Sequence, residues 1–267
     1  MMLLVGATVA CTTPRPTTPA PATAGDKFSV PSDTLIAGIE ERGRFLADYD
    51  QAAWHATDAF MALKPELNTG NTMLARRRPD GRWTVLFARL NAAADTLYVL
   101  YEALPTERPD SFVMRAHQPA IPRTGDERLA AAALHAAMAD FGTPERTYNS
   151  YVLPRPDRAV WVYFLPAQTE ATFFPHGADV RYLIAADGRR ILDKHPMHRA
   201  LLNLALPADA VTGIHTVLVD DVPQDSDVFL VLARHPRRPE LIATAHYNYA
   251  IAIDGSIRWE WVDRSKP

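Results

Sequence analysis

Apolar residues recur at helical spacing in two long stretches of the chain. In segment 33–64 they fall three or four positions apart, after a Ser-Asp pair that can cap a helix and before Pro65. Because Gly43 stands inside this segment, the pattern predicts either one long helix or two shorter ones. An Ala-rich stretch at 126–141 predicts a second helix, and Gly142 directly after it is a residue typical of helix ends.

Strands are predicted where short runs of β-branched and aromatic residues occur. Several of these runs flank Asp-Gly pairs, which favour hairpins because Gly accepts the positive φ of a tight turn. The three such pairs lie at 80–81, 187–188 and 254–255. The expected strands cover 73–78, 82–87, 96–101, 148–153, 159–165, 180–184, 189–192, 212–218, 241–244, 247–253 and 256–261.

Two shorter helices are expected at 198–204 and 225–232, and the residues between Tyr101 and Asp126 are expected to form a Pro-rich loop. Together these elements predict an α+β fold of antiparallel sheets with interspersed helices, after a disordered N-terminal tether. Arg, Tyr and Thr alternate with aliphatic residues in several strands, which indicates sheets with one face in water.

Composition limits the classes of protein to which the chain can belong. Its 267 residues are 48% hydrophobic and 22% charged, which is typical of a globular protein. A balance of 28 Lys and Arg against 31 Asp and Glu argues against a nucleic-acid partner, which would require excess positive charge. A single cysteine excludes an intramolecular disulfide framework and any Cys-rich zinc module.

That cysteine, Cys11, follows an uncharged apolar stretch and precedes a segment rich in Thr, Pro and Ala. The stretch is too short to span a bilayer but suits the apolar region of a secretory signal. Ala10-Cys11 at its end resembles the lipobox of bacterial lipoproteins, although Thr8 stands where Leu is usual and no Lys or Arg precedes the stretch. The resemblance implies cleavage before Cys11 and acylation of its thiol and amino group.

The lipobox resemblance divides the chain. It implies a signal peptide at 1–10 and a Pro-rich linker at 11–26 that acts as a semi-rigid spacer. Thr12, which is not the Asp linked to inner-membrane retention, implies an outer-membrane anchor facing the periplasm. The rest of the chain is expected to form two α+β domains, at 27–167 and 168–267.

Candidate metal-binding and catalytic residues lie in the second of these domains. There His215, on an expected strand, is followed by a loop and by Asp227 in an expected helix. This segment resembles the metal-binding part of the JAMM/MPN metallopeptidases, in which zinc lies between two His and an Asp and an upstream Glu activates a water molecule. The resemblance implies His215 and Asp227 as metal ligands. It also implies Glu170, the sole upstream Glu in this half, as the catalytic base.

Val217 stands where the second His of that pattern should be, and Val offers no lone pair to a metal. The expected cofactor is therefore none, with zinc as the alternative. The leading hypothesis is a lipid-anchored protein of the periplasm with a binding or envelope-structural role and a metal-free JAMM/MPN-like half. The alternative is a metal-dependent hydrolase that takes a further ligand from His176 or His246, so the sequence does not decide whether the protein is an enzyme.

Two neighbouring features have simpler interpretations. His195 and His198, with Pro196 between them, are interpreted as surface histidines. Asp220, Asp221, Asp225 and Asp227 form an acidic segment that is typical of a solvated turn, with calcium binding as the alternative.

Overall fold

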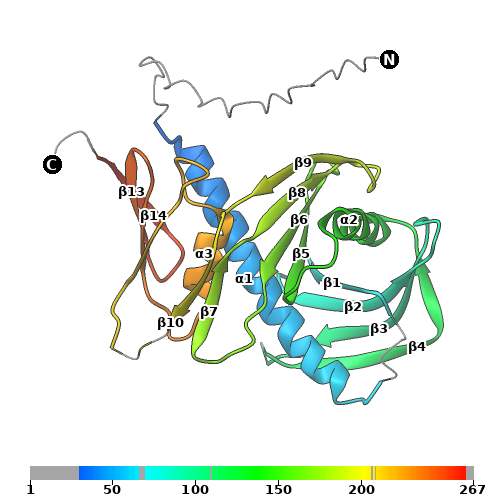
Figure 1. Ribbon diagram of the computed structural model, residues 1–267. Coiled ribbons are helices and arrows are strands. Elements are labelled where there is room, and N and C mark those ends of the chain that lie inside the picture. Colours follow the sequence, from blue (N-terminus) through cyan, green and yellow to red (C-terminus); the bar gives the residue numbers. More distant parts are fainter. Residues whose placement is uncertain (1–29, 66–69, 109, 206, 208, 263–267) are drawn as a thin grey trace, which may run out of the picture. The chain divides into compact units, whose positions relative to one another are not determined.

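The computed structural model describes residues 30–65, 70–108, 110–205, 207 and 209–262 (Figure 1). The described residues from Ser32 onward group into one compact unit, and the expected α+β class is confirmed by its helices and antiparallel sheets. The described helices are α1 (Asp33–Met61), α2 (Asp126–Phe141) and α3 (Asp225–Ala233). The described strands are β1 (Thr72–Arg77), β2 (Trp83–Leu90), β3 (Leu97–Pro105), β4 (Phe112–Arg123), β5 (Tyr148–Pro154), β6 (Val160–Pro166), β7 (Phe173–Gly177), β8 (Val180–Ile184), β9 (Ile191–Pro196), β10 (Leu201–Ala205), β11 (Gly213–Thr216), β12 (Glu240–Ala243), β13 (Tyr247–Ile251) and β14 (Ile257–Trp261).

Helix α1 runs diagonally through the unit and is continuous, so the first of the two predicted arrangements is the correct one (Figure 1). The Oγ of Ser32 accepts a hydrogen bond from the backbone N–H of Leu35 at 3.2 Å and caps the helix. Gly43 does not break α1 but lies against α3. A Cβ at this position would come within 2.8 Å of the carbonyl oxygen of Asp225 and would overlap Val228. Gly43 therefore permits the close packing of α1 and α3.

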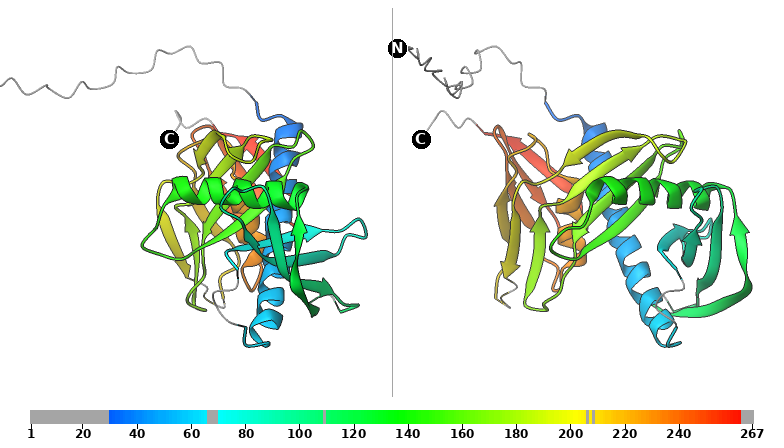
Figure 2. Two further views of the ribbon diagram at one scale, coloured as in Figure 1. Left: turned by 90° about the vertical axis from the view of Figure 1, so that its right-hand side faces the viewer. Right: turned by 45° about the vertical axis from the view of Figure 1, so that its right-hand side comes forward.

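Helix α2 packs between two four-stranded sheets (Figure 2). One sheet has the strand order β1-β2-β3-β4 and the other β5-β6-β8-β9, with all neighbours antiparallel. The Ala and Leu side chains of α2 share a core with Val, Leu and Ile from both sheets. The predicted boundary between residues 167 and 168 falls between β6 and β8, two paired strands of one sheet.

Two further sheets, one of two strands and one of four, contact α3. Strand β10 pairs with β7, and β11 to β14 form a sheet in which β11 and β12 are parallel. The core around α1 and α3 draws on apolar residues of β7, β10, β12, β13 and β14 and on Val217, which follows β11. No helix among the described residues combines the length and apolar character needed to cross a membrane.

Three segments differ from the prediction, and one of them is β7, where no strand was expected. Residues 112–123 form β4, not a loop. Strand β4 lies at a sheet edge with a neighbour on one side only, and Pro is tolerated there because an edge strand can lack an N–H on its open side. The helix predicted at 198–204 is wrong, since 201–205 form β10. The apolar spacing there suits both structures, and pairing of Leu201 to Ala205 with residues of β7 decides for the strand.

Candidate metal centre

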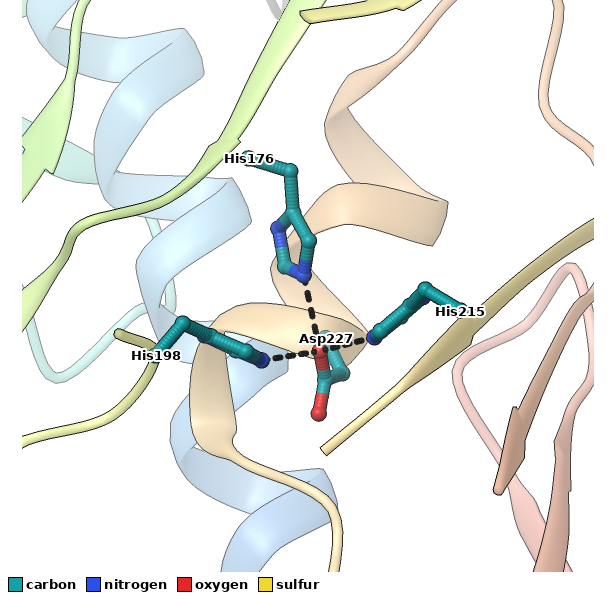
Figure 3. Close-up of side chains that lie close together, drawn as sticks. All are labelled: His176, His198, His215 and Asp227. Atoms are coloured by element: carbon teal, nitrogen blue, oxygen red, sulfur yellow. Dashed lines mark hydrogen bonds and ion pairs between the residues drawn. The ribbon is translucent and has the colours of Figure 1, made fainter. Parts of the chain in front are cut away.

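Four side chains from four separate elements converge on one point in the C-terminal part of the unit (Figure 3). His176 lies on β7, His198 follows β9, His215 lies on β11 and Asp227 lies in the first turn of α3. The Nε2 atoms of His176, His198 and His215 lie 3.0, 3.1 and 3.0 Å from Oδ1 of Asp227. All four atoms lie within 4.8 Å of one another.

The three separations from Oδ1 of Asp227 are close to those between neighbouring ligands of a tetrahedral metal ion. Zinc bonds of 2.0–2.1 Å to nitrogen and about the same length to oxygen place neighbouring ligand atoms about 3.3 Å apart. The four residues are also shielded from water, with exposed fractions of 3%, 9%, 7% and 0% for His176, His198, His215 and Asp227. An ion at this point would exchange its water shell for protein ligands.

Close chain approach and a helix cap hold the ligands in place. Gly177, next to His176, has a φ of +83°, and a Cβ there would overlap the carbonyl oxygen of Ala200, so only Gly lets β7 approach the segment that carries His198. Oδ2 of Asp227 accepts the backbone N–H of Gln224 at 2.6 Å. This capping bond leaves Oδ1 directed toward the three imidazoles.

Carboxylates fix the protonation of two imidazoles. Nδ1 of His198 lies 2.9 Å from Oδ1 of Asp179, and Nδ1 of His215 lies 2.9 Å from Oε1 of Glu240. An ionised carboxylate only accepts, so each Nδ1–H donates, and the Nε2 of a neutral imidazole then presents a lone pair toward Asp227. His198 Nε2 is buried without a hydrogen-bond partner in the described structure, although it lies 3.1 Å from Asp227.

The charges around this point leave room for a divalent cation. Asp227, Asp179 and Glu240 contribute three negative charges, and Arg234, whose Nη1 lies 2.7 Å from Oε2 of Glu240, contributes one positive charge. With neutral imidazoles the sum is two negative charges. Buried charge is costly unless it is compensated, so an ion of charge +2 would neutralise the cluster.

Without a metal, protons have to take the place of that cation. Burial opposes a charge on His198, but the carboxylates of Asp227 and Asp179 raise its pKa to about 10. Burial likewise opposes a charge on His215, while Asp227 and Glu240 raise its pKa to about 9. Burial lowers the pKa of His176, and although burial alone would raise that of Asp227, the imidazoles hold it well below its usual value.

The acidic segment that leads into α3 was interpreted as a solvated turn. This is wrong for Asp225 and Asp227, which lie in the first turn of α3 and are 1% and 0% exposed. Asp221 lies 2.7 Å from Nδ1 of His246 and Asp220 lies 3.0 Å from Nε2 of His195. His246 is therefore engaged with Asp221, away from the four converging residues.

Three of the four converging residues were expected from the sequence. His215 and Asp227 were the expected ligands and His176 a suggested one, while His198, interpreted as a surface residue, is buried. Val217, at the position of the second His in the JAMM/MPN pattern, packs in the core at 1% exposure. Nothing local in the sequence marks His198, because its approach depends on the pairing of β10 with β7.

Glu170, the expected base, lies on an exposed turn before β7. Its carbonyl oxygen accepts the backbone N–H of Phe173 at 3.4 Å. Within the described residues, no hydrogen bond or ion pair joins its carboxylate to the four converging side chains. Its assignment as a base stays a prediction.

Comparison with known proteins finds no matching family model, no similar curated protein and no similar solved structure. The arrangement of His176, His198, His215 and Asp227 is thus interpreted from its geometry and chemistry alone.

Proposed function

We propose that this protein binds one divalent transition-metal ion, zinc being the expected one, through His176, His198, His215 and Asp227. One observation carries the proposal: three imidazole Nε2 atoms meet a carboxylate oxygen, although the Nδ1 atoms of two imidazoles already donate to carboxylates. Lone pairs converging in this way repel one another unless protons or a metal cation lie between them. Imidazole nitrogen and carboxylate oxygen together suit zinc and its first-row neighbours better than calcium or magnesium, which take oxygen ligands.

The ligand set favours a structural role over hydrolysis. A catalytic zinc keeps one position for water beside three protein ligands, whereas four protein ligands complete a tetrahedron. All four side chains are buried, and Glu170 lies on an exposed turn. We therefore place the metal-dependent hydrolase second. Hydrolysis of a peptide by the zinc-loaded protein, lost in Glu170→Gln, would reverse that order.

The metal would fasten separate parts of the C-terminal region to one another. His176 belongs to the β7–β10 pair, His215 to the sheet of β11 to β14, and Asp227 to α3, which packs on α1. The bond network would thus join two sheets to the long helix. An ion that binds the folded state only stabilises it by about 2.7 kcal/mol at a hundredfold excess over its dissociation constant.

A location in the bacterial cell envelope is the second part of the proposal. Cys11, which lies outside the described residues, would carry the lipid anchor, and residues 12–26 would link it to the folded unit. The proposed ligand set contains no thiol, so the metal would survive in an oxidising compartment. Replacement of Cys11 by Ser should release the protein from the membrane fraction, and a Cys11→Ser protein that stayed there would contradict the anchor.

Chelation tests the metal directly. The melting temperature of the zinc-loaded protein should fall in EDTA, and His198→Ala should show a low melting temperature that EDTA no longer changes. His55→Ala is the matched control, since His55 lies on α1 beside Trp54 and outside the cluster. A wild-type protein whose melting temperature is the same with zinc and with EDTA would contradict the proposed function.

A further inference from the structure

A cleft of about 750 Å³ opens between α1, β5, β7 and α3. It is lined by residues adjacent to the metal centre, Pro175 before His176 and Phe229 after Asp227, but by none of the four proposed ligands. Polar and apolar side chains share its walls. The cleft therefore has the size and mixed lining of a binding site for a small molecule.

The charged residues that line the cleft are of one sign. Asp50 and Glu170 contribute carboxylates, while no Lys or Arg is among the described lining residues and His235 is the sole imidazole. A carboxylate or phosphate ligand would face repulsion and find no cationic partner here. The lining selects for a ligand that is positively charged.

Asp50 lies on α1 as a mostly buried carboxylate with little compensation. Its Oδ1 accepts a hydrogen bond from the hydroxyl of Tyr151 at 2.7 Å, which is the one partner that the described structure gives it. Burial raises the pKa of Asp50, and the hydrogen bond from Tyr151 offsets only part of that rise. A carboxylate has about four lone-pair sites, so most of its capacity to accept is open to a ligand.

Aromatic rings supply the other half of a cation site. Trp54, one turn along α1 from Asp50, is 54% exposed, and Phe174 and Phe229 line the wall formed by β7 and α3. The face of an aromatic ring attracts a cation and also covers the hydrocarbon part of its bearer. A carboxylate and aromatic rings in one cleft can together bind a ligand that has a positively charged group and a hydrocarbon part.

We propose that this cleft binds an organic ammonium ion, with the charged nitrogen at Asp50 and the hydrocarbon part against Trp54 and the neighbouring rings. The ammonium group could belong to a free amine or to the side chain of a lysine in a peptide, and both present the same chemistry to the cleft. The site is independent of the proposed metal, since it uses none of the metal ligands.

Three probes of similar size separate charge from shape. Butylamine, which is a cation at neutral pH, butanol and butyrate are titrated into the full chain and followed by calorimetry or by amide shifts in NMR spectra. Butylamine should bind, with butanol weaker by about tenfold or more, because a hydrogen bond to a charged group contributes about 1.5–3 kcal/mol. Butyrate should not bind. Equal binding of butanol and butylamine, or binding of none of them, would overturn the proposal.

Variants locate the site. Asp50→Asn should weaken butylamine binding by about tenfold or more, and Trp54→Ala by about two- to fivefold. Asp58→Asn is the matched control, because Asp58 is an exposed carboxylate of α1 outside the cleft lining. A circular dichroism spectrum and metal content like those of the wild type show that a variant has folded. Unchanged butylamine binding by folded Asp50→Asn would contradict the assignment.

A capped Ala-Lys-Ala peptide then distinguishes the two sources of the ammonium group. Binding tighter than that of butylamine, with amide shifts extending along β5, indicates a lysine side chain of a peptide. Binding no tighter than that of butylamine indicates a free amine. Either result requires the loss in Asp50→Asn, so the cleft assignment is tested in both arms.

Discussion

Asp225 and Asp227 lie in the same turn of α3, both buried, and have opposite surroundings. Asp225 pairs with the guanidinium groups of Arg42 and Arg181 at 2.9 and 2.7 Å and accepts the hydroxyl of Tyr163 at 2.9 Å. Asp227 instead faces three imidazole nitrogens. Arg is always protonated, so the Asp225 cluster is complete within the protein, whereas imidazoles held by carboxylates at Nδ1 have lone pairs left to offer.

The contrast shows that burial of a carboxylate does not by itself indicate a binding site. Two guanidinium groups against one carboxylate leave the Asp225 cluster with one positive charge. Three carboxylates against Arg234 leave the Asp227 cluster with two negative charges when its imidazoles are neutral. Two features distinguish a complete ion cluster from one that binds an added ion. The first is the type of atom that contacts the carboxylate, and the second is the other groups to which that atom's side chain is bonded.

Replacement of Asp225 by Asn should give the largest loss of stability and leave the metal in place. Two partly exposed guanidinium groups would lose the buried carboxylate that pairs with them. Breaking a fully buried pair costs about 3–5 kcal/mol, so we expect a loss at the lower end of that range. Urea unfolding should show this loss while the zinc content stays at the wild-type value. Loss of zinc in a folded Asp225→Asn protein would show that the two clusters are not separate.

Replacement of Asp179 by Asn should have an intermediate effect and act on the metal alone. The carboxylate orients His198 through its Nδ1 at 2.9 Å, and loss of such an outer partner lowers metal affinity by about 10- to 100-fold. Competition with a chromogenic chelator measures the change. Glu260→Gln, at an exposed position of β14, is the control, and an affinity in Asp179→Asn equal to that of the control would contradict the role of Asp179.

A shift of pH should give the smallest effect and separate the clusters without mutation. In the metal-free protein the pKa values of His198 and His215 are raised to about 10 and 9, so the folded state holds protons that the unfolded state loses near pH 6.5. Their stabilising contribution is complete below pH ~6.5 and is lost as the pH rises through ~9 and ~10. Raising the pH from about 7 to about 7.5 should cost about 1 kcal/mol.

The zinc-bound protein should not show this loss, because its imidazoles carry no exchangeable proton at Nε2. Equal pH dependence of stability for the zinc-bound and chelated protein, measured by urea unfolding, would contradict the assignment of the ligands.

Local patterns predicted much of the fold. The two long helices, and the hairpins around Asp80-Gly81, Asp187-Gly188 and Asp254-Gly255, are confirmed because caps, apolar spacing and turn residues act over a few positions. Strand β10 was predicted as a helix, and β7 was not predicted. Their pairing with each other, a contact between segments over twenty residues apart, decides their structure.

The residues of the candidate site also fall into two groups, those that local sequence could indicate and those that pairing of distant strands brings in. His215 and Asp227 lie twelve positions apart on a strand and the helix that follows it, so the sequence could place them together. His198 depends on the β7–β10 pairing and on the close approach at Gly177, neither of which has a local signal. Val217 suggested a lost metal site because the JAMM/MPN pattern has its second His two residues after the first. In the structure the further His side chains come from β7 and from the segment after β9.

Zinc binding at the Asp227 cluster is tested most directly by the metal content of three purified proteins. Each protein is exposed to zinc, the unbound ion is removed, and the bound metal is measured by mass spectrometry. We expect one zinc ion per chain in the wild type, one in Asp225→Asn and almost none in Asp227→Asn. A wild-type protein without stoichiometric metal, or an Asp227→Asn protein that keeps its metal, would contradict it.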